Sequence, residues 1–236
     1  MSLNNKNILV TGGLGQVGIA LLTYIQSHYP TATLYAIDLQ LPSPPSHLSI
    51  PGVKYHAGNI TSQPTIHAIF QEVKPQIVFH TAGLIPQIAA RLNLDMEKNF
   101  INVNLEGSKI VLEESKGVGT VQAFVYLSSA DVVKGYAWEN LRGVDEGTPI
   151  PQVFDDWYAK SKVSGLISFF LLPPFVPLRI VGNFIKPVYH VFSHFHLKMY
   201  PHQLIKAGTS RIPHSPLLHA LLPHNCNKTT RPVLAL

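Results

Sequence analysis

A glycine-rich turn between a predicted strand and a predicted helix constrains this chain more than any other feature. Residues 7–11 (NILVT) form an apolar run typical of a buried strand, and residues 15–27 have helical periodicity. The intervening sequence TGGLGQVG satisfies both GxGxxG from Gly13 and GxxGxxG from Gly12. Such a turn lets the backbone approach a pyrophosphate at a helix N-terminus. The predicted cofactor-binding residues of this turn are Gly12, Gly13, Gly15, Gln16, Val17 and Gly18.

An acidic residue stands where a dinucleotide-binding turn requires one. Residues 33–38 (TLYAID) predict a second strand that ends on Asp38, twenty residues after Gly18. A carboxylate there can accept hydrogen bonds from the adenosine ribose hydroxyls, and it would repel the 2′-phosphate of NADP. Residues 39–42 contain no Arg or Lys to offset that repulsion. The sequence therefore predicts NAD as the cofactor.

Strand-like and helical segments alternate as far as about residue 164. The further predicted elements are strands at 53–56, 77–81 and 123–128, a helix that Thr61 or Ser62 begins, and a helix that spans about 99–116. This alternation is typical of a parallel sheet with crossover helices. We expect a doubly wound α/β Rossmann domain.

A tyrosine and a lysine stand four residues apart after these segments. On a helix, Tyr158 and Lys162 project from one face. Hydride transfer from an alcohol needs a base near the hydroxyl, and a tyrosine has an ordinary pKa of about 10. A neighbouring ammonium and a positive nicotinamide ring both favour the phenolate. Behind a dinucleotide-binding turn, this pair predicts an alcohol dehydrogenase site.

Together these motifs resemble the extended short-chain dehydrogenases/reductases, and within that group the 3β-hydroxysteroid dehydrogenase family, including sterol 4-carboxylate 3-dehydrogenases. The resemblance covers about residues 6–164. Residues 58–60 (GNI) stand where the family has G-D-[ILV] beside the adenine, with Asn59 in place of the acid, and residues 80–83 (HTAG) resemble its H-x-A-[AS]. Residues 102–107 (NVNLEG) resemble N-V-N-G-T. The cofactor contacts that the resemblance implies are Asn59, Ile60, Thr81, Ala82, Gly83 and Asn102, with Tyr158 and Lys162.

The resemblance also implies the reaction. Residues 124–130 (FVYLSSA) resemble the family's [FIV]-V-Y-T-S-S, whose second serine orients the substrate hydroxyl and corresponds to Ser129. Ser128 is the adjacent alternative, and His80 is interpreted as a packed residue rather than a catalyst. The catalytic residues are then Tyr158, Lys162 and Ser129, and the implied reaction oxidises a steroid or sterol 3β-hydroxyl to the ketone with NAD.

Two other functions remain open from the sequence. Another extended short-chain enzyme, such as a nucleotide-sugar epimerase or dehydratase or a ketone reductase, would share every one of these residues. A chain that has lost its substrate region would bind NADH and turn over no alcohol.

The character of the sequence changes after Gly165. We expect residues 1–165 to form the NAD-binding domain and residues 166–236 to be an irregular tail, non-native or an incomplete substrate region. Only residues 178–182 (LRIVG) resemble the family's next strand. The apolar stretch 166–178 contains three prolines and is shorter than the ~20 residues of a transmembrane helix, so only contact with a membrane surface stays open. His190, His194 and His196 have a spacing that metal ligands can have, but no acid or cysteine lies near them, and no metal is predicted.

Charge and cysteine content limit the partners and the compartment. The formal charge of +5 divides into −4 for residues 1–156 and +9 for residues 157–236, and the basic part carries no nucleic-acid-binding motif. No nucleic-acid partner is expected, and the oligomeric state stays undetermined. Cys226 is the single cysteine and no signal-peptide pattern follows Met1. We expect an intracellular protein, cytoplasmic or associated with the endoplasmic reticulum membrane.

Overall fold

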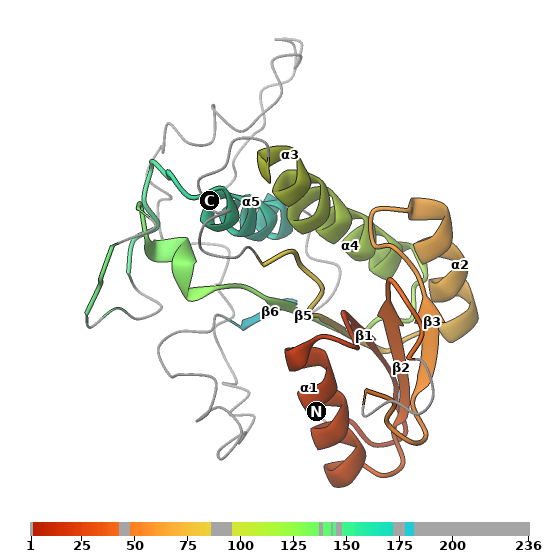
Figure 1. The fold of residues 1–236 in the computed structure, drawn as a ribbon. Coiled ribbons are helices and arrows are strands. Elements are labelled where there is room, and N and C mark those ends of the chain that lie inside the picture. Colours follow the sequence, from red (N-terminus) through yellow and green to blue (C-terminus); the bar gives the residue numbers. More distant parts are fainter. Residues whose placement is uncertain are drawn as a thin grey trace, which may run out of the picture. The chain divides into compact units, whose positions relative to one another are not determined.

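A six-stranded parallel sheet organises the part of the chain that the computed structural model describes, namely residues 2–42, 48–85, 96–136, 139–142, 144, 148–171 and 178–181 (Figure 1). The strands are β1 (Asn7–Thr11), β2 (Thr33–Asp38), β3 (Lys54–Ala57), β4 (Ile77–His80), β5 (Ala123–Leu127) and β6 (Leu178–Val181). Their order is β3-β2-β1-β4-β5-β6, and every neighbouring pair is parallel. This is the doubly wound order of a Rossmann fold, so the predicted fold class is confirmed.

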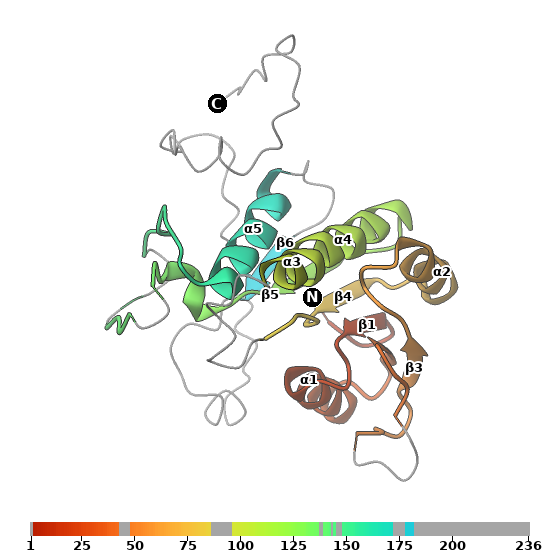
Figure 2. The ribbon, with the colours of Figure 1, turned by 45° about the horizontal axis from the view of Figure 1, so that its top comes forward.

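Helices cover both faces of the sheet. They are α1 (Gln16–His28), α2 (Gln63–Val73), α3 (Glu97–Phe100), α4 (Ser108–Gly117) and α5 (Trp157–Leu171), with a π-helix η3 (Ile101–Gly107) and a short 3₁₀ turn η4 (Ala130–Val133). Helix α1 lies on one face, whereas α2, α4 and α5 lie on the other, as both ribbon views show (Figures 1 and 2). The crossover direction therefore reverses between β1 and β4, and in doubly wound folds the ligand crevice lies at the carboxyl ends of the strands at such a point.

Strand β1 divides the core into two clusters because successive side chains of a strand point to opposite faces. Ile8 and Val10 pack with the residues of α1, including Leu22. Leu9 packs on the other side with a cluster that includes Phe70 of α2. The apolar run of the central strand is therefore buried on both faces, as parallel sheets require.

The predicted strands and helices agree with the structure to within one residue, with one exception. Residues 99–116 were predicted as a continuous helix, but the segment begins as α3, opens into the π-helix η3, and continues as α4. The π segment is only seven residues long, fewer than two turns, so apolar periodicity does not distinguish it from an α-helix. The π-helix places Asn104 and Gly107 inward, where Gly107 lies close against Ile60.

The first structural unit continues beyond Gly165. Helix α5 runs without a break to Leu171, β6 then pairs with β5, and both elements belong to the compact unit Met1–Phe184. Gly165 lies in the interior of α5, and a Cβ there would lie 2.7 Å from the Tyr126 hydroxyl. Its glycine lets the helix approach β5 and does not end it.

Several sequence predictions fall outside the described residues. These are the tail predictions for residues 172–177 and 182–236. In the described parts of the chain, no helix is both long and apolar enough to cross a membrane.

Candidate active site

The candidate site lies at the carboxyl ends of β1 and β4, where the crossover direction reverses. Residues that follow β4 fold over the end of β1: the Thr81 hydroxyl donates to the Thr11 carbonyl oxygen at 2.7 Å, and the Ala82 N–H donates to the Thr11 hydroxyl at 3.3 Å. Gly12 then has a φ of +71°, and a Cβ there would lie 2.8 Å from the Ala82 backbone. The two strand ends therefore meet with only glycine between them.

The remaining glycines of the turn pack helix α1 against the sheet. A Cβ on Gly18 would overlap the Gly12 carbonyl oxygen, and one on Gly13 would lie 2.5 Å from the Ala36 Cβ. The sequence left two registers of the motif open. A side chain does not fit at Gly12, Gly13 or Gly18. The first glycine of each register is therefore required by packing.

The N-terminus of α1 is open to a ligand. Gly15 is exposed, and among the described residues the only heavy atom that a Cβ there would meet within 4 Å is the Gly12 carbonyl oxygen. No side chain in the described part of the chain caps the helix, and its first turn contains no acidic residue. The backbone N–H groups of Gln16 and Val17 belong to the first turn, which has no intrahelical acceptors. This arrangement fits the pyrophosphate of a dinucleotide, which would take the place of a side-chain cap.

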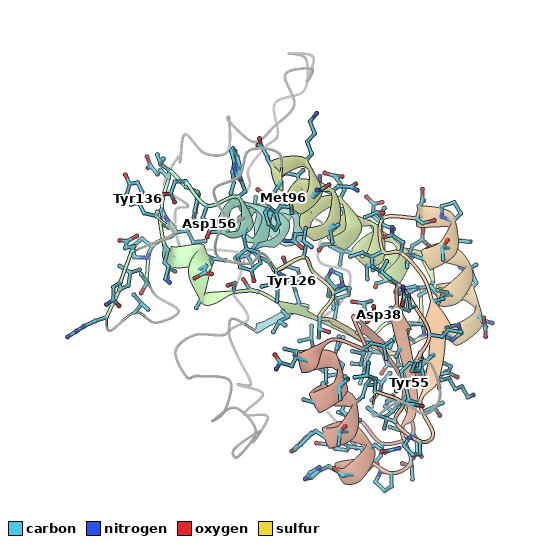
Figure 3. All side chains as sticks on the ribbon, in the orientation of Figure 1. Asp38, Tyr55, Met96, Tyr126, Tyr136 and Asp156 are labelled. Atoms are coloured by element: carbon cyan, nitrogen blue, oxygen red, sulfur yellow. The ribbon has the colours of Figure 1, made fainter. Side chains whose placement is uncertain are left out.

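Asp38 ends β2 beside this turn (labelled in Figure 3). One carboxylate oxygen accepts from the Leu14 N–H at 2.9 Å, and the other accepts from the Leu39 N–H at 2.8 Å. The two bonds hold a half-buried carboxylate next to the glycine turn, and each oxygen keeps a second lone pair for a further donor. Ribose hydroxyls are donors of that kind.

A buried hydrogen-bonded chain lies beneath the crevice. His80 Nδ1 lies 2.7 Å from the Thr11 hydroxyl, and His80 Nε2 lies 2.8 Å from the Ser108 hydroxyl. Ser108 donates to the Asn104 carbonyl oxygen at 2.7 Å, so its oxygen accepts from His80 Nε2–H, and Nδ1 accepts from Thr11. Burial, and secondarily the charge of Lys162, lowers the pKa of His80 to about 3. The histidine is a neutral, packed residue, as interpreted from the sequence.

Tyr158 and Lys162 lie in the first turns of α5. Both are buried, with 6% and 4% of their surface exposed. Asp156 fixes the start of the helix, because its carboxylate accepts from the Tyr158 N–H at 2.8 Å and from the Ala159 N–H at 3.4 Å (Figure 3). The Phe100 ring packs edge-on against the Tyr158 ring, with centroids 6.4 Å apart.

Lys162 is a buried cation that a backbone carbonyl and an aromatic ring hold in place. Its Nζ donates to the Leu127 carbonyl oxygen at 3.1 Å and lies 5.3 Å from the centre of the Tyr126 ring. Burial lowers the pKa of Lys162 to about 8. Burial, and secondarily the nearby Tyr158, raises the pKa of Tyr126, so Tyr126 remains a neutral phenol.

The two serines at the end of β5 differ in their surroundings. Ser129 begins η4, where its hydroxyl accepts from the Asp131 N–H at 3.2 Å, and it keeps a proton to donate. The hydroxyl of Ser128 is buried and has no hydrogen-bond partner among the described residues. Both serines directly follow Leu127, whose carbonyl oxygen accepts the hydrogen bond from Lys162.

The structure brings Asn104, and not the predicted Asn102, to the site. Asn102 is exposed and lines a surface depression with Glu97 and Lys98, among others. The buried Asn104 accepts from the Leu84 N–H at 2.7 Å, and it donates to the Leu84 carbonyl oxygen at 3.1 Å and to the Ser161 hydroxyl at 3.0 Å. It therefore ties the segment after β4 to α5.

Gly83 lies between these two elements. A Cβ on Gly83 would lie 3.1 Å from Lys162 Nζ and 3.2 Å from Asn104 Oδ1. Thr81, Ala82 and Gly83 thus lie between the glycine turn and α5, and their contact with the cofactor stays a prediction. Asn104 and Asp156 were not identified from the sequence, although an Asp two residues before a helical Tyr is a recognisable helix-start signal.

Of the two cofactor contacts predicted after β3, Asn59 has an exposed side chain and Ile60 a buried one. Asn59 is exposed, and its side-chain oxygen accepts from the Thr61 N–H at 3.0 Å and from the Thr61 hydroxyl at 2.9 Å. The Ile60 side chain is buried in the core against Gly107. Only the backbone of Ile60 can therefore face a ligand.

Comparison with known proteins gives one family. Residues 9–165 match the model of the 3-beta hydroxysteroid dehydrogenase/isomerase family. The chain is 35% identical over 107 residues to the decarboxylating sterol-4-alpha-carboxylate 3-dehydrogenase of Schizosaccharomyces pombe, a match covering 45% of this chain and 28% of that protein. It is 32% identical over 159 residues to the 3 beta-hydroxysteroid dehydrogenase/Delta 5-->4-isomerase of Mycobacterium tuberculosis, covering 66% and 40%. The matched region thus spans less than half of either relative.

Solved structures share the fold. The UDP-glucose 4-epimerase of Thermus thermophilus, crystallised with NAD, aligns with a TM-score of 0.61 and 21% identity over 74% of this chain and 53% of that chain. Among the residues that the structure describes, no three His, Cys, Asp or Glu side chains gather where they could hold a metal ion.

Proposed function

This chain belongs to the 3-beta hydroxysteroid dehydrogenase/isomerase family, and from that premise we propose that it binds NAD and oxidises the 3β-hydroxyl of a steroid or sterol to a ketone. The observation that carries the proposal is the convergence of three groups at one crevice. These are the uncapped N-terminus of α1, the Asp38 carboxylate, and the Tyr158 and Lys162 pair of α5. Each group meets a separate need of a dinucleotide-dependent alcohol oxidation.

The proposed roles follow from the positions of these side chains. Tyr158, as the phenolate, takes the hydroxyl proton of the substrate, while Ser129 donates a hydrogen bond that positions the substrate oxygen. Lys162 binds the nicotinamide ribose and stabilises the phenolate by its charge. Bound NAD supplies the acceptor for the hydride that leaves the carbinol carbon, so loss of one proton and one hydride gives the ketone.

The cofactor half of the proposal is tested by titrating the chain with NADH and NADPH. If Asp38 binds the adenosine ribose as proposed, a 2′-phosphate would lie next to its carboxylate, so NADH should bind roughly ten times more tightly or better, on the order of one charge repulsion near a protein surface. Asp38→Ala should narrow that preference. Equal affinities of the native chain for the two dinucleotides would contradict the role of Asp38.

The substrate half is tested by profiling alcohols. Formation of NADH with a 3β-hydroxysteroid and not with its 3α epimer supports the proposal. The sequence also suits a nucleotide-sugar epimerase or dehydratase. Conversion of UDP-glucose or a related nucleotide sugar, with no steroid oxidation, would contradict the steroid proposal and favour this second function. Binding of NADH without turnover of either class would identify the chain as a cofactor-binding remnant.

A further inference from the structure

The sheet order indicates where the adenine of a dinucleotide would lie, given the proposed function. The N-terminus of α1 follows β1 and suits the pyrophosphate, and Asp38 ends the next strand, β2, where it suits the adenosine ribose. Continuing in the same direction along the sheet leads to the end of β3. There Ala57 pairs with Asp38, and the Gly58 N–H donates to the Asp38 carbonyl oxygen at 2.7 Å. The next residue is Asn59.

The surroundings of Asn59 suit a flat, partly apolar base. Leu39 directly follows Asp38 and is 68% exposed, so an apolar side chain is accessible next to the carboxylate. Asn59 is exposed as well, and it follows the residue that is hydrogen-bonded to Asp38. An apolar side chain and an amide therefore lie on adjacent strand ends beside the predicted ribose site.

The hydrogen bonds of Asn59 determine which of its atoms remains for a ligand. A backbone N–H can only donate, so the side-chain atom 3.0 Å from the Thr61 N–H must be the oxygen. The Thr61 hydroxyl donates to the same oxygen at 2.9 Å. The amide nitrogen carries the two N–H groups of this exposed side chain. An aspartate at this position could only accept hydrogen bonds from a base, whereas Asn59 presents a donor.

We propose that Asn59 sets the base specificity of the cofactor site by donating a hydrogen bond to the edge of the purine, so that the chain accepts hypoxanthine as readily as adenine. At the 6-position adenine carries an amine, which donates, and hypoxanthine carries a carbonyl oxygen, which accepts. The Asn59 amide can donate to the hypoxanthine oxygen or to an adenine ring nitrogen. A carboxylate at residue 59 would instead accept from the adenine amine and repel the hypoxanthine oxygen.

The test measures the affinities of NADH and nicotinamide hypoxanthine dinucleotide, reduced, for the full chain. Both carry the same fluorescent nicotinamide, so one titration method serves both. The native chain should bind the hypoxanthine form within about threefold of NADH, or more tightly. In Asn59→Asp the ratio should shift about fivefold to tenfold toward NADH, the effect of one gained and one opposed hydrogen bond. The carboxylate can still accept from Thr61, so the local structure is kept.

Asn59→Ala is the matched control, because it removes the side-chain donor without adding charge, and it should lose affinity for both dinucleotides equally. Comparing ratios cancels the general repulsion between a new carboxylate and the pyrophosphate. This inference is wrong if Asn59→Asp has the same ratio of NADH affinity to hypoxanthine-dinucleotide affinity as the native chain, whatever that ratio is. Such a result would leave the proposal of NAD binding intact. Failure to bind either dinucleotide would overturn the proposed function, and this inference with it.

Discussion

Replacing Lys162 by methionine should stabilise the ligand-free protein while weakening cofactor binding. Burial lowers the pKa of Lys162 from 10.5 to about 8, so the folded state opposes the charged amine. At about 1.4 kcal/mol per pH unit, that shift corresponds to a cost on the order of 3 kcal/mol at pH 7. Methionine keeps an unbranched stem and loses the hydrogen bond to the Leu127 carbonyl, which is worth about 1 kcal/mol. The expected net gain is about 2 kcal/mol.

The pH dependence separates this cause from simple repacking. Below about pH 8 the amine of Lys162 is charged in both the folded and the unfolded chain, and the full cost applies. Between about pH 8 and 10.5 the unfolded chain binds more protons than the folded chain, so native stability rises with pH.

Urea unfolding without cofactor, at pH values from about 7 to about 10, measures the difference between the native chain and Lys162→Met. The advantage of the variant should shrink steadily above pH 8. A difference that does not change with pH would refute the assignment of the cost to a buried ammonium. NADH titration at neutral pH should show weaker binding by the same variant, since Lys162 is proposed to hold the nicotinamide ribose.

Two further predictions concern α5. Gly165→Ala should lower the free energy of unfolding by about 1–2 kcal/mol, because its Cβ would lie 2.7 Å from the Tyr126 hydroxyl and overpacking outweighs the better helix propensity. Gly117→Ala, whose Cβ would meet nothing within 4 Å among the described residues, is the control for urea unfolding, and equal effects of the two changes would contradict the packing argument. Tyr158→Phe should leave NADH affinity within about twofold of the native chain, since it removes only the proposed base; a large loss in the NADH titration would give the hydroxyl a role in cofactor binding instead.

Much of the fold could be predicted from the sequence because several local signals agree. The apolar run of β1 predicts a buried strand, and the glycine turn predicts a close connection to the next element. The helical period of α1 predicts a helix packed on the sheet. Asp38 was found for the same reason, since its distance from Gly18 depends on a helix and strand of ordinary length.

The missed features depend on packing between distant segments. Asn102 and Asn104 are equivalent in the sequence pattern, and only the π-helix and its contact with Leu84 and Ser161 determine that the second one turns inward. The close approach of Gly165 to the Tyr126 hydroxyl is likewise a contact between α5 and β5, which are far apart in the sequence. A single sequence contains no local signal for such contacts.

Isotope transfer tests the central proposal most directly. A 3β-hydroxysteroid that carries deuterium on C3 is incubated with NAD and the chain, and the mass of the recovered NADH is measured. We predict NADH one mass unit heavier, in an amount that falls to the uncatalysed background in Tyr158→Phe. If the chain binds NAD but the recovered NADH carries no deuterium, the proposed reaction is contradicted. Equal deuterium transfer by the Tyr158→Phe variant would contradict it as well.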